Sequence, residues 1–393
     1  MKHIQDALHG YIELNSEEVN VLDSAQMQRL RRIRQLGLSS LVYPSATHTR
    51  FQHSLGVMHI AGRFAESLDL DDQRSQELRI AGLLHDSGHG PFSHASEVVA
   101  EKHGFSHEDF SCRIIDELED EYSVESQRVK KIIKGDLEIG QIVAGDIDAD
   151  RMDYLMRDSH ASGLEHGEID YDTIIRLAEI DSRRLVFSEK AVQALESLFT
   201  ARFHMIKTLY NHHTSLIAEK MLQRSLENLI EEENIAVEEM MQLDDYEAHS
   251  KLLNSKGSSR KLYSRIKDRN LYKRALVWDI DDVPKEALKS LERRIKKPRK
   301  LEKEIAEEAD TRPDEVIIHT PSTPGISDID VKVKKKGDIR PLSELSPIPD
   351  ALTDAEWRNV ALRVYAPDEK VDEVREASRK ILKDYTKVLE GYT

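Results

Sequence analysis

A short polar stretch, HDSGHGPFSH at residues 85–94, follows directly on an apolar run that ends in Leu83 and Leu84. It places three histidines and one aspartate among two glycines and a proline. The apolar run predicts a buried helix, and burying such polar groups is costly unless partners satisfy them. The chain must therefore either join these side chains in a hydrogen-bonded cluster or use them to hold an ion.

Helical periodicity dominates the chain up to about residue 280. Apolar residues recur there at three- and four-residue spacing, which is typical of helices with one buried face. The clearest such segments are 24–38, 54–70, 74–86, 111–122, 150–159 and 189–230. Gly37 is expected to end the first of them. Strand signals are few in this part, and the best lies at 183–187.

The pattern changes after about residue 280. Residues 314–320, 328–337 and 359–367 alternate apolar and polar side chains as half-buried strands do. Charged helices are predicted over 293–310 and 368–385. We therefore predict a mainly α fold, a helical bundle over residues 1–285, with a small C-terminal α+β lobe over 286–393.

Composition limits the classes of function. The net charge is −16, from 57 basic and 73 acidic residues, which argues against a general nucleic-acid-binding protein. The chain has no run of about 18 apolar residues and its start lacks the apolar core of a signal peptide. Its single cysteine, Cys112, fits a reducing compartment. We expect a cytoplasmic protein without a membrane partner.

Two histidines and two carboxylates form the strongest candidate site: His53, His85, Asp86 and Asp150. This mixed nitrogen and oxygen set suits Mg, Mn, Fe or Zn, with positions left for water or phosphate. The residues alone leave a second possibility open, because histidine–carboxylate clusters also stabilise cores. Other histidines in the region are interpreted as ordinary core or surface residues, namely His48, His59 and His103.

Three longer stretches carry a family resemblance. Residues 29–57, 83–97 and 148–163, with RLRRIRQLGL, HDSGHGPFSH and DADRMDYLMRDS among them, resemble the HD-domain phosphohydrolase superfamily. Within it they are most similar to the branch of deoxynucleoside triphosphate (dNTP) triphosphohydrolases. The resemblance covers approximately residues 2–220, and no counterpart of the SAM domain of mammalian members is expected.

The resemblance implies a metal held by the four residues above. It also implies that His89, His94 and His107 act at the scissile phosphate, with Glu97 supporting the catalytic histidine. Phosphoester hydrolysis needs an activated water, neutralised phosphate oxygens and a proton for the leaving oxygen, and histidines can donate that proton near neutral pH. The alternative for His89 is that it caps a helix beside a simple turn.

Nucleotide contacts follow from the same resemblance. They comprise phosphate contacts by Arg50, Arg151 and Arg202, sugar-hydroxyl contacts by Tyr154 and Asp158, a deoxyribose wall of Gln35 and Leu36, and base contacts by Tyr210 and Asn211. Arginine suits phosphate because it can donate two parallel hydrogen bonds. Mammalian members have lysine at the position of Arg151 and glutamine at that of Asn211, so phosphate geometry and base preference stay open.

A regulatory pocket is the last expectation. In the branch that the chain resembles, a guanine nucleotide binds between subunits and helps to assemble a tetramer. Residues matching that pocket are Lys2, Asp23, Gln28 and Arg31. The alternative is that Asp23 caps a helix and Arg31 lies on a solvated helix face. We expect a homo-oligomer, with a tetramer favoured, and a GTP or dGTP activator.

The expected function is metal-dependent hydrolysis of dNTPs to deoxynucleoside and inorganic triphosphate. One alternative is another HD-type reaction, by a nucleotidase or a phosphodiesterase. The sequence shows no second tight cluster of histidine ligands, which disfavours the two-metal phosphodiesterases. The other alternative is a nucleic-acid-binding or regulatory protein on an HD scaffold. Release of triphosphate from a dNTP separates these possibilities.

Overall fold

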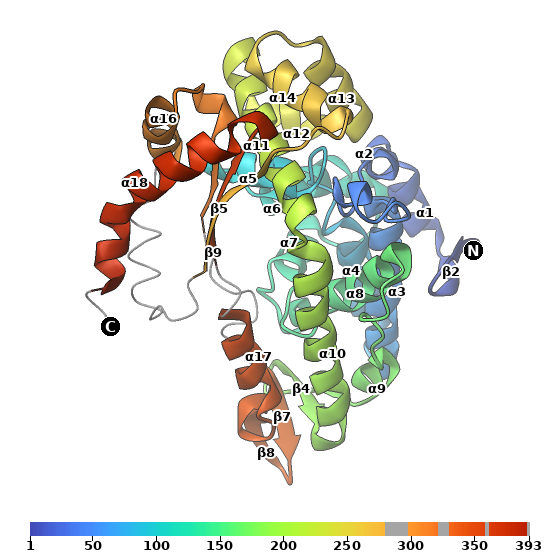
Figure 1. The fold of residues 1–393 in the computed structure, drawn as a ribbon. Helices are drawn as coiled ribbons and strands as arrows, with labels where there is room; N and C mark the ends of the chain where they lie inside the picture. Colours follow the sequence, from blue (N-terminus) through green and yellow to red (C-terminus); the bar gives the residue numbers. More distant parts are fainter. Residues whose placement is uncertain (280–297, 321–329, 358–360, 391–393) are drawn as a thin grey trace.

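The computed structural model describes residues 1–279, 298–320, 330–357 and 361–390. Helices form most of the molecule, and small sheets lie at its periphery (Figure 1). A two-stranded hairpin of β1 (Lys2–Asp6) and β2 (Gly10–Leu14) comes first. The helices up to residue 267 are α1 (Ser16–Asp23), α2 (Ala25–Arg29), α3 (Arg50–Ser67), α4 (Asp72–Leu84), α5 (His94–Lys102), α6 (His107–Glu117), α7 (Ser126–Ile133), α8 (Ala149–Ser162), α9 (Tyr171–Arg176), α10 (Val192–Met205), α11 (His213–Glu233), α12 (Val237–Gln242), α13 (Asp245–Asn254) and α14 (Ser258–Lys267).

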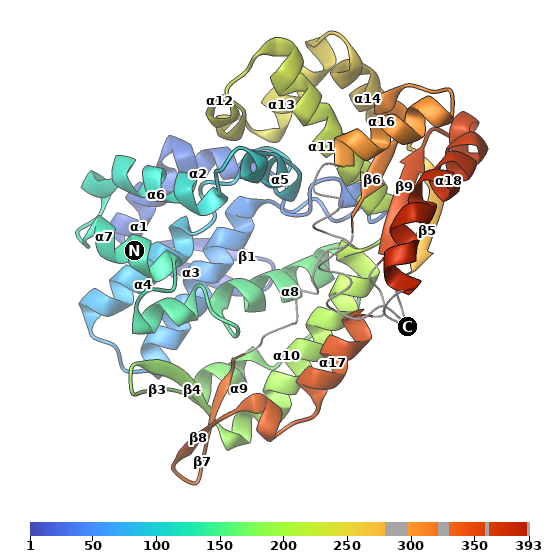
Figure 2. The ribbon, with the colours of Figure 1, turned by 90° about the vertical axis from the view of Figure 1, so that its left-hand side faces the viewer.

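Helix α3 is the centre of the larger core. Thirteen of its eighteen residues are buried, which identifies it as a helix covered on nearly every side. It packs against α4 along one side and against α8 on another (Figure 2). Gly56 makes the second contact possible, because a Cβ there would come within 1.8 Å of Asp153 Oδ1 on α8. The close approach brings polar residues of α3 and α8 together inside the core.

The helix predicted over 24–38 is shorter than expected. It consists of α2 and one 3-10 turn (Leu30–Arg32), and Ile33 is already extended. The cause is tertiary, because Gln35 N donates to His48 O and Arg50 N donates to Ile33 O. This pairing draws the segment out of helical conformation and places Gln35 and Leu36 beside the start of α3.

The helix predicted over 189–230 is interrupted. Helix α10 continues into a π-helical turn at Ile206–Tyr210, and α11 starts only at His213. π-helical turns are uncommon and frequently occur at functional sites. This one ends on Tyr210, one of the predicted nucleotide contacts.

The remaining strands form two sheets. The first has the order β3-β4-β7-β8, and the second has the order β5-β9-β6. Their bounds are β3 (Ala178–Asp181), β4 (Arg184–Ser188), β5 (Lys273–Asp279), β6 (Ile317–His319), β7 (Lys332–Lys335), β8 (Asp338–Pro341) and β9 (Ala361–Ala366). Strand β4 confirms the strand signal at 183–187. Strands β1, β2, β3, β5 and β8 lie where the sequence analysis did not predict strands.

The C-terminal part of the chain lies in two places (Figures 1 and 2). Strand β7 pairs in parallel with β4, and α17 (Ile348–Trp357) packs along α10. By contrast, α16 (Pro298–Glu308) and α18 (Val371–Glu390) pack together, and α18 lies against β5 and β9. The predicted boundary at 285/286 falls outside the described residues.

The fold class is as predicted, mainly α with a small C-terminal α+β lobe. The predicted strands at 314–320, 328–337 and 359–367 contain β6, β7 and β9, and the closing helix is α18. Among the described helices, none combines the length and the apolar character needed to cross a bilayer.

Candidate metal centre

The four predicted metal ligands meet where three helices converge. His53 lies on α3, His85 and Asp86 end α4, and Asp150 lies in the first turn of α8. Asp150 Oδ1 is 2.9 Å from His53 Nε2 and 3.7 Å from His85 Nε2. Asp86 is 3.5 Å from His53 Nε2 and 3.4 Å from His85 Nε2 through its two oxygens. One nitrogen or oxygen from each of His53, His85 and Asp86 lies within 4.8 Å of the others.

The two imidazoles have their free nitrogens directed into this cluster. His85 Nδ1 is 2.9 Å from the carbonyl oxygen of Gly82, so Nδ1 carries the hydrogen and Nε2 keeps its lone pair. His53 Nδ1 is 2.8 Å from Asp153 Oδ2. Apart from the carboxylate oxygens of Asp86 and Asp150, neither Nε2 has a partner in the described part of the chain, although both are buried. Buried nitrogens left in this way beside two carboxylates fit a divalent cation.

The charges around the cluster favour a positive charge within it. Burial alone would lower the pKa of His53, but hydrogen bonds and charges of Asp150 and Asp153 raise it to about 10. The pKa of Asp150, which burial would raise, is lowered by His53 and His85. A bound cation would take the place of the imidazole proton, because a ligating histidine must be neutral.

A second group of histidines lies beside the first. The rings of His89 and His107 stack with centroids 4.2 Å apart, and His89 Nε2 is 3.3 Å from Asp86 Oδ1. Glu97 contacts two histidines at once, His107 Nδ1 through Oε1 and His94 Nδ1 through Oε2, the latter at 3.1 Å. The predicted catalytic residues are thus in mutual contact. His89 contacts Asp86 rather than a helix end, so the capping alternative is wrong.

The environments of these histidines differ. Burial and the charge of Arg50 lower the pKa of His89 to about 3, so this ring is neutral. Burial also acts on His107, but the hydrogen bond and charge of Glu97 raise its pKa. His107 therefore keeps a proton that it can donate, whereas His89 does not.

The turn after α4 allows α6 to approach. A Cβ at Gly88 would lie 2.2 Å from the carbonyl oxygen of His107, so only glycine fits between the turn and α6. Ser111 of α6 fastens the contact, since its Oγ accepts from Gly88 N at 2.9 Å and donates to His85 O at 2.8 Å. Glycine at this position therefore brings His107 next to the metal ligands.

The structure contains a second possible metal-binding group, which the sequence analysis did not expect. Donor atoms of Asp86, His89 and His107 lie within 4.8 Å of one another, so this trio is a second set able to hold an ion. It shares Asp86 with the first set. The premise that the chain has no second cluster of histidine ligands is therefore wrong, because the fold brings together residues that are separated in sequence.

Arg50 links the cluster to a strained turn. Its Nη1 contacts Asp86, and its Nε donates to Ser93 Oγ at 2.8 Å. Its buried Nη2 has no partner among the described residues and remains available to a ligand. Phe92 and Ser93 both have positive φ, 59° and 53°, which is costly for residues other than glycine and typical of functional sites.

Several predicted nucleotide contacts gather on one side of the metal cluster. Tyr210 donates to Asp158 Oδ2 at 2.7 Å, and the ring of Tyr154 lies edge-on to Tyr210 with centroids 6.2 Å apart. Leu36, His94 and Tyr210 line one small cavity. The cavity therefore joins the predicted deoxyribose wall, the base contact and a catalytic histidine.

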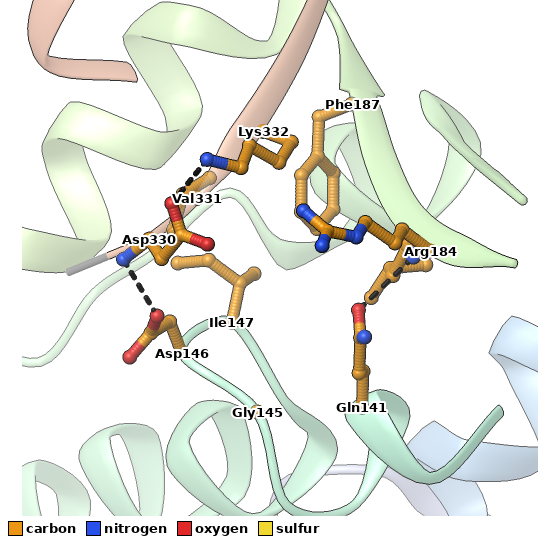
Figure 3. A pocket seen from close by; sticks show the side chains of 10 residues that line it. Gln141, Gly145, Asp146, Ile147, Arg184, Phe187, Asp330, Val331 and Lys332 are labelled. Carbon is orange, nitrogen blue, oxygen red and sulfur yellow. Dashed lines mark hydrogen bonds and ion pairs between the residues drawn. The ribbon is translucent and has the colours of Figure 1, made fainter. Parts of the chain in front are cut away.

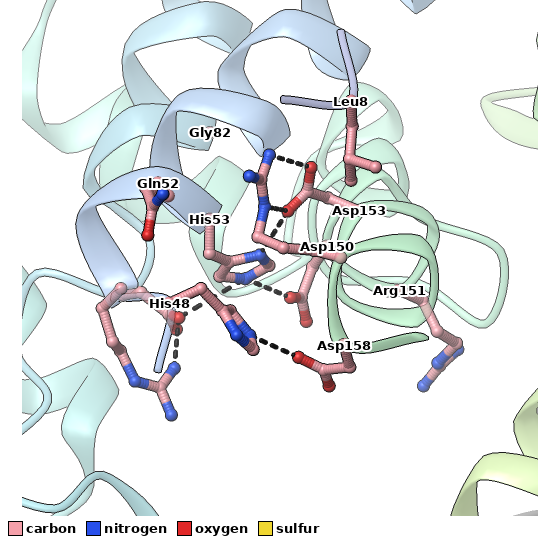
Figure 4. A network of polar contacts seen from close by, with 12 residues as sticks. Leu8, His48, Gln52, His53, Gly82, Asp150, Arg151, Asp153 and Asp158 are labelled. Carbon is pink, nitrogen blue, oxygen red and sulfur yellow. Dashed lines mark hydrogen bonds and ion pairs between the residues drawn. The ribbon is translucent and has the colours of Figure 1, made fainter. Parts of the chain in front are cut away.

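Four other predicted nucleotide contacts have different surroundings. Arg151 donates to the carbonyl oxygens of Gly145, at 2.9 Å, and of Asp146, and its side chain lies away from His53 (Figure 4). Asn211 is exposed, and Gln35 is buried. The positive charge of Arg202 acts on Tyr154 and Tyr210. The roles of these residues stay predictions.

The four residues of the expected regulatory pocket lie near the N-terminus. Lys2 Nζ is 3.2 Å from Asp23 Oδ2, and Arg31 Nε donates to Gln28 Oε1 at 2.9 Å. Arg31 also stacks over the ring of Phe51 at 3.6 Å. Asp23 ends α1, and the hydroxyl that caps α2 belongs to the next residue, so the capping alternative for Asp23 is wrong.

Sequence reasoning missed several polar residues behind the ligands. His48 Nε2 is 2.7 Å from Asp158 Oδ1, so His48 holds one of the sugar-contact candidates rather than filling an ordinary core position. Asp153 contacts His53 (Figure 4) and also His9. The only sequence signal was the spacing of Asp153, three residues after Asp150, which puts both on one face of α8.

Another polar cavity lies between the segment before α8 and strands β4 and β7 (Figure 3). Asp330 N donates to Asp146 Oδ2 at 2.9 Å across it, and Leu185 N donates to Gln141 Oε1 at 3.0 Å. Basic and acidic side chains are mixed in its walls. The cavity contains none of the predicted site residues.

Two family models match the chain. The model of the HD domain matches residues 50–158, and the model of the HD associated region matches residues 169–387. The first range begins with Arg50 and ends with Asp158, and it contains all four candidate metal ligands. The second covers more than half of the chain.

Similar proteins span most of the chain. An uncharacterized protein of Methanocaldococcus jannaschii is 36% identical over 98% of this chain and 84% of its own. The deoxynucleoside triphosphate triphosphohydrolase SAMHD1 homolog of Dictyostelium discoideum is 30% identical over 69% of this chain, which spans only 59% of that protein. The crystal structure of a hypothetical protein from Aquifex aeolicus matches with a TM-score of 0.78 and 31% identity, over 96% of this chain and 99% of the other. Together with the matches to both family models, these likenesses show that the chain belongs to the HD-domain family.

Proposed function

We propose that the protein is a metal-dependent dNTP triphosphohydrolase, which releases deoxynucleoside and inorganic triphosphate. The observation that carries this proposal is that the His53, His85, Asp86 and Asp150 cluster leads to a cavity lined by Leu36, His94 and Tyr210. The link is His89, which lies 3.3 Å from Asp86 Oδ1 and has its ring centroid 6.0 Å from that of His94. The likeness to the Dictyostelium triphosphohydrolase supports it at the level of substrate class.

A divalent metal bound by the four ligands would supply a Lewis acid and an activated water. The protein's own side chains orient the catalytic groups and donate the proton. Glu97 holds His94 and His107 by their Nδ1 atoms, so each ring presents Nε2 outward. His107 donates a proton to the leaving 5′-oxygen, because Glu97 keeps it protonated.

Binding of the nucleotide uses the neighbouring residues. Arg50 offers its free Nη2 to a phosphate oxygen while Nη1 stays on Asp86. Tyr154 and Asp158 bind the sugar 3′-hydroxyl, and Asp158 is held by the hydrogen bond from Tyr210. Leu36 excludes a 2′-hydroxyl sterically from the cavity that it lines. Arg151, Arg202, Gln35, Tyr210 and Asn211 complete the proposed contacts.

The products of hydrolysis test the proposal. The metal-loaded protein is incubated with each of the four dNTPs in ¹⁸O-labelled water, with Mg, Mn, Fe and Zn in separate reactions. Attack at the α-phosphorus breaks its bond to the 5′-oxygen, so label enters the triphosphate and the deoxynucleoside stays unlabelled. Pyrophosphate with a monophosphate, or phosphate with a diphosphate, would contradict the proposal.

The second candidate is a two-metal phosphodiesterase or nucleotidase. The shared position of Asp86 between the His53–His85 set and the His89–His107 set favours it. Two metals about 3.5–4 Å apart can stabilise the attacking and the leaving oxygens together. Two metal equivalents per chain, with cleavage of a cyclic or linear diester and none of dNTPs, would select this candidate.

We also propose regulation by a guanine nucleotide bound by Lys2, Asp23, Gln28 and Arg31, in a homo-oligomer of which a tetramer is favoured. Lys2 and Arg31 offer positive charge to a triphosphate, and Asp23 can accept hydrogen bonds from a guanine edge. A location in the cytoplasm is part of the same proposal. Turnover with and without GTP, beside the particle mass in solution, tests the regulatory part.

A further inference from the structure

We propose that the N-terminal hairpin is part of the metal centre: His9 at its turn acts, together with Asp153, as a positioning residue for the ligand imidazole of His53. This inference rests on the proposed function only in taking His53 as a metal ligand. It assigns a role to a segment that lies outside the matched HD domain, residues 50–158.

Asp153 joins the hairpin to the ligand. Its Oδ2 is 2.8 Å from His53 Nδ1, and its Oδ1 is 2.7 Å from His9 Nε2. The exposed fractions of the Asp153, His9 and His53 side chains are 0–1%. The relay His9–Asp153–His53 therefore runs entirely inside the protein (Figure 4 shows its His53–Asp153 part).

Arg157 provides a second link between the Asp153 carboxylate and the hairpin. It donates to Asp153 through Nε at 2.8 Å and Nη2 at 2.9 Å. Its Nη1 donates to Asp6 Oδ2 at 2.9 Å. Asp6 Oδ1 in turn accepts from the backbone nitrogens of Leu8 at 2.9 Å and His9 at 3.1 Å. The turn that presents His9 is thus built on the carboxylate that Arg157 holds.

The arrangement decides which nitrogen of His53 faces the metal site. A carboxylate on Nδ1 keeps the hydrogen there and leaves the Nε2 lone pair for a cation, and it makes the imidazole a stronger ligand. The contact of Asp153 with His9 also prevents the Asp153 carboxylate from rotating away from His53. The absence of a side chain at Gly56 leaves space for Asp153, since a Cβ at Gly56 would overlap both Asp153 and Arg157.

A purely structural role predicts a different behaviour. If the relay only stabilised the core, its loss would lower the unfolding temperature and leave the metal affinity of the remaining folded protein unchanged. If it positions His53, its loss weakens metal binding and lowers kcat while KM for the nucleotide stays constant. Changes to such supporting residues typically reduce metal affinity or activity by about 10- to 100-fold.

The test uses the full chain and Mn²⁺ alone, titrated against a fluorescent chelator, beside thermal unfolding of the metal-free protein. The variants are His9→Ala and Asp153→Asn, with His9→Gln as the conservative change, since its amide N–H can still donate to Asp153. His3→Ala is the matched control, because His3 is an exposed histidine on the same hairpin. We expect about 10- to 100-fold weaker Mn²⁺ binding for the first two, partial recovery in His9→Gln and no change in the control.

Mn²⁺ affinities of His9→Ala and Asp153→Asn within about twofold of the wild type, with or without a lower unfolding temperature, would overturn the inference. If His9→Ala fails to fold, the comparison of Asp153→Asn with the wild type decides in the same way. The titration needs no substrate. A wild-type protein that binds Mn²⁺ and cleaves no dNTP would therefore defeat the proposed function and leave this inference standing.

Discussion

The metal centre and the expected regulatory pocket are both clusters of polar side chains, but their settings are opposite. At the centre, His53, His85 and Asp86 have side chains at most 8% exposed. In the pocket, Lys2 and Asp23 are 49% and 56% exposed and contact each other. The comparison teaches that burial affects how strongly a polar cluster points to function.

The physical reason is the difference in what each arrangement costs. A buried polar atom left without a partner costs about 1–3 kcal/mol, so the free nitrogens of His53 and His85 demand an explanation. An exposed ion pair such as Lys2–Asp23 contributes about 0.2–1 kcal/mol and needs none. The following predictions test this contrast, starting with the largest effect.

Loss of a metal ligand should abolish function. We expect His85→Ala and Asp150→Ala to lose bound metal and all measurable turnover, because each removes one of four protein ligands. Metal analysis by mass spectrometry after gel filtration, together with a dNTP assay, measures both. Full metal content in the two variants would show that the buried cluster is only a structural one.

Loss of the proposed proton donor, His107, should slow the reaction without changing the amount of bound metal. We expect His107→Ala to lower kcat by about 10²- to 10⁴-fold at unchanged metal content. Because Glu97 raises the pKa of His107, the wild-type rate should persist to higher pH than an ordinary histidine allows and fall as pH rises further. His103→Ala is the control, an exposed histidine at the end of α5. Equal rates for the two variants would remove His107 from the mechanism.

The deoxyribose wall should give a moderate effect. We expect the wild type to prefer dATP over ATP in kcat/KM by about 10- to 200-fold, the range that one steric contact provides. Leu36→Ala should bring the two values closer, since it opens the cavity wall beside Tyr210. A preference that survives this change unaltered would place sugar selection elsewhere.

The exposed pocket should give the smallest effect on the protein itself. We expect Lys2→Ala to change the unfolding free energy by less than about 1 kcal/mol, as for other exposed ion pairs. The same variant, and Arg31→Ala, should reduce stimulation by GTP while leaving the rate without GTP unchanged. Chemical denaturation and turnover across GTP concentrations measure the two quantities. If GTP stimulates neither wild type nor variants, the pocket has no regulatory role.

Part of the candidate metal site was readable from the sequence because its chemistry is local. His85 and Asp86 stand next to each other at the end of an apolar helix, and the sequence alone indicates that such groups need a partner or an ion. The helical character of the first 270 residues or so was equally readable from apolar spacing. The strand at 184–188 and three C-terminal strands followed from alternation in the same way.

Other features depended on contacts between distant segments. The helix from residue 25 ends early because Ile33 and Gln35 pair with backbone groups at positions 48 and 50. The second possible ligand trio unites His89, in the turn after α4, with His107 at the start of α6 through stacking of their rings, which spacing in the sequence does not reveal. The placement of β7 beside β4 joins segments more than 140 residues apart.

By itself, the sequence determined a mainly helical chain with a histidine–aspartate cluster that belongs inside it, because side-chain periodicity and the cost of burying polar groups are local properties. Only the tertiary structure decided which groups support that cluster. His9 and Asp153 are 144 positions apart and meet where the N-terminal hairpin contacts α8, while Gly56 lets α8 approach α3 and its His53. Such a contact depends on how closely helices pack, and no local pattern encodes it.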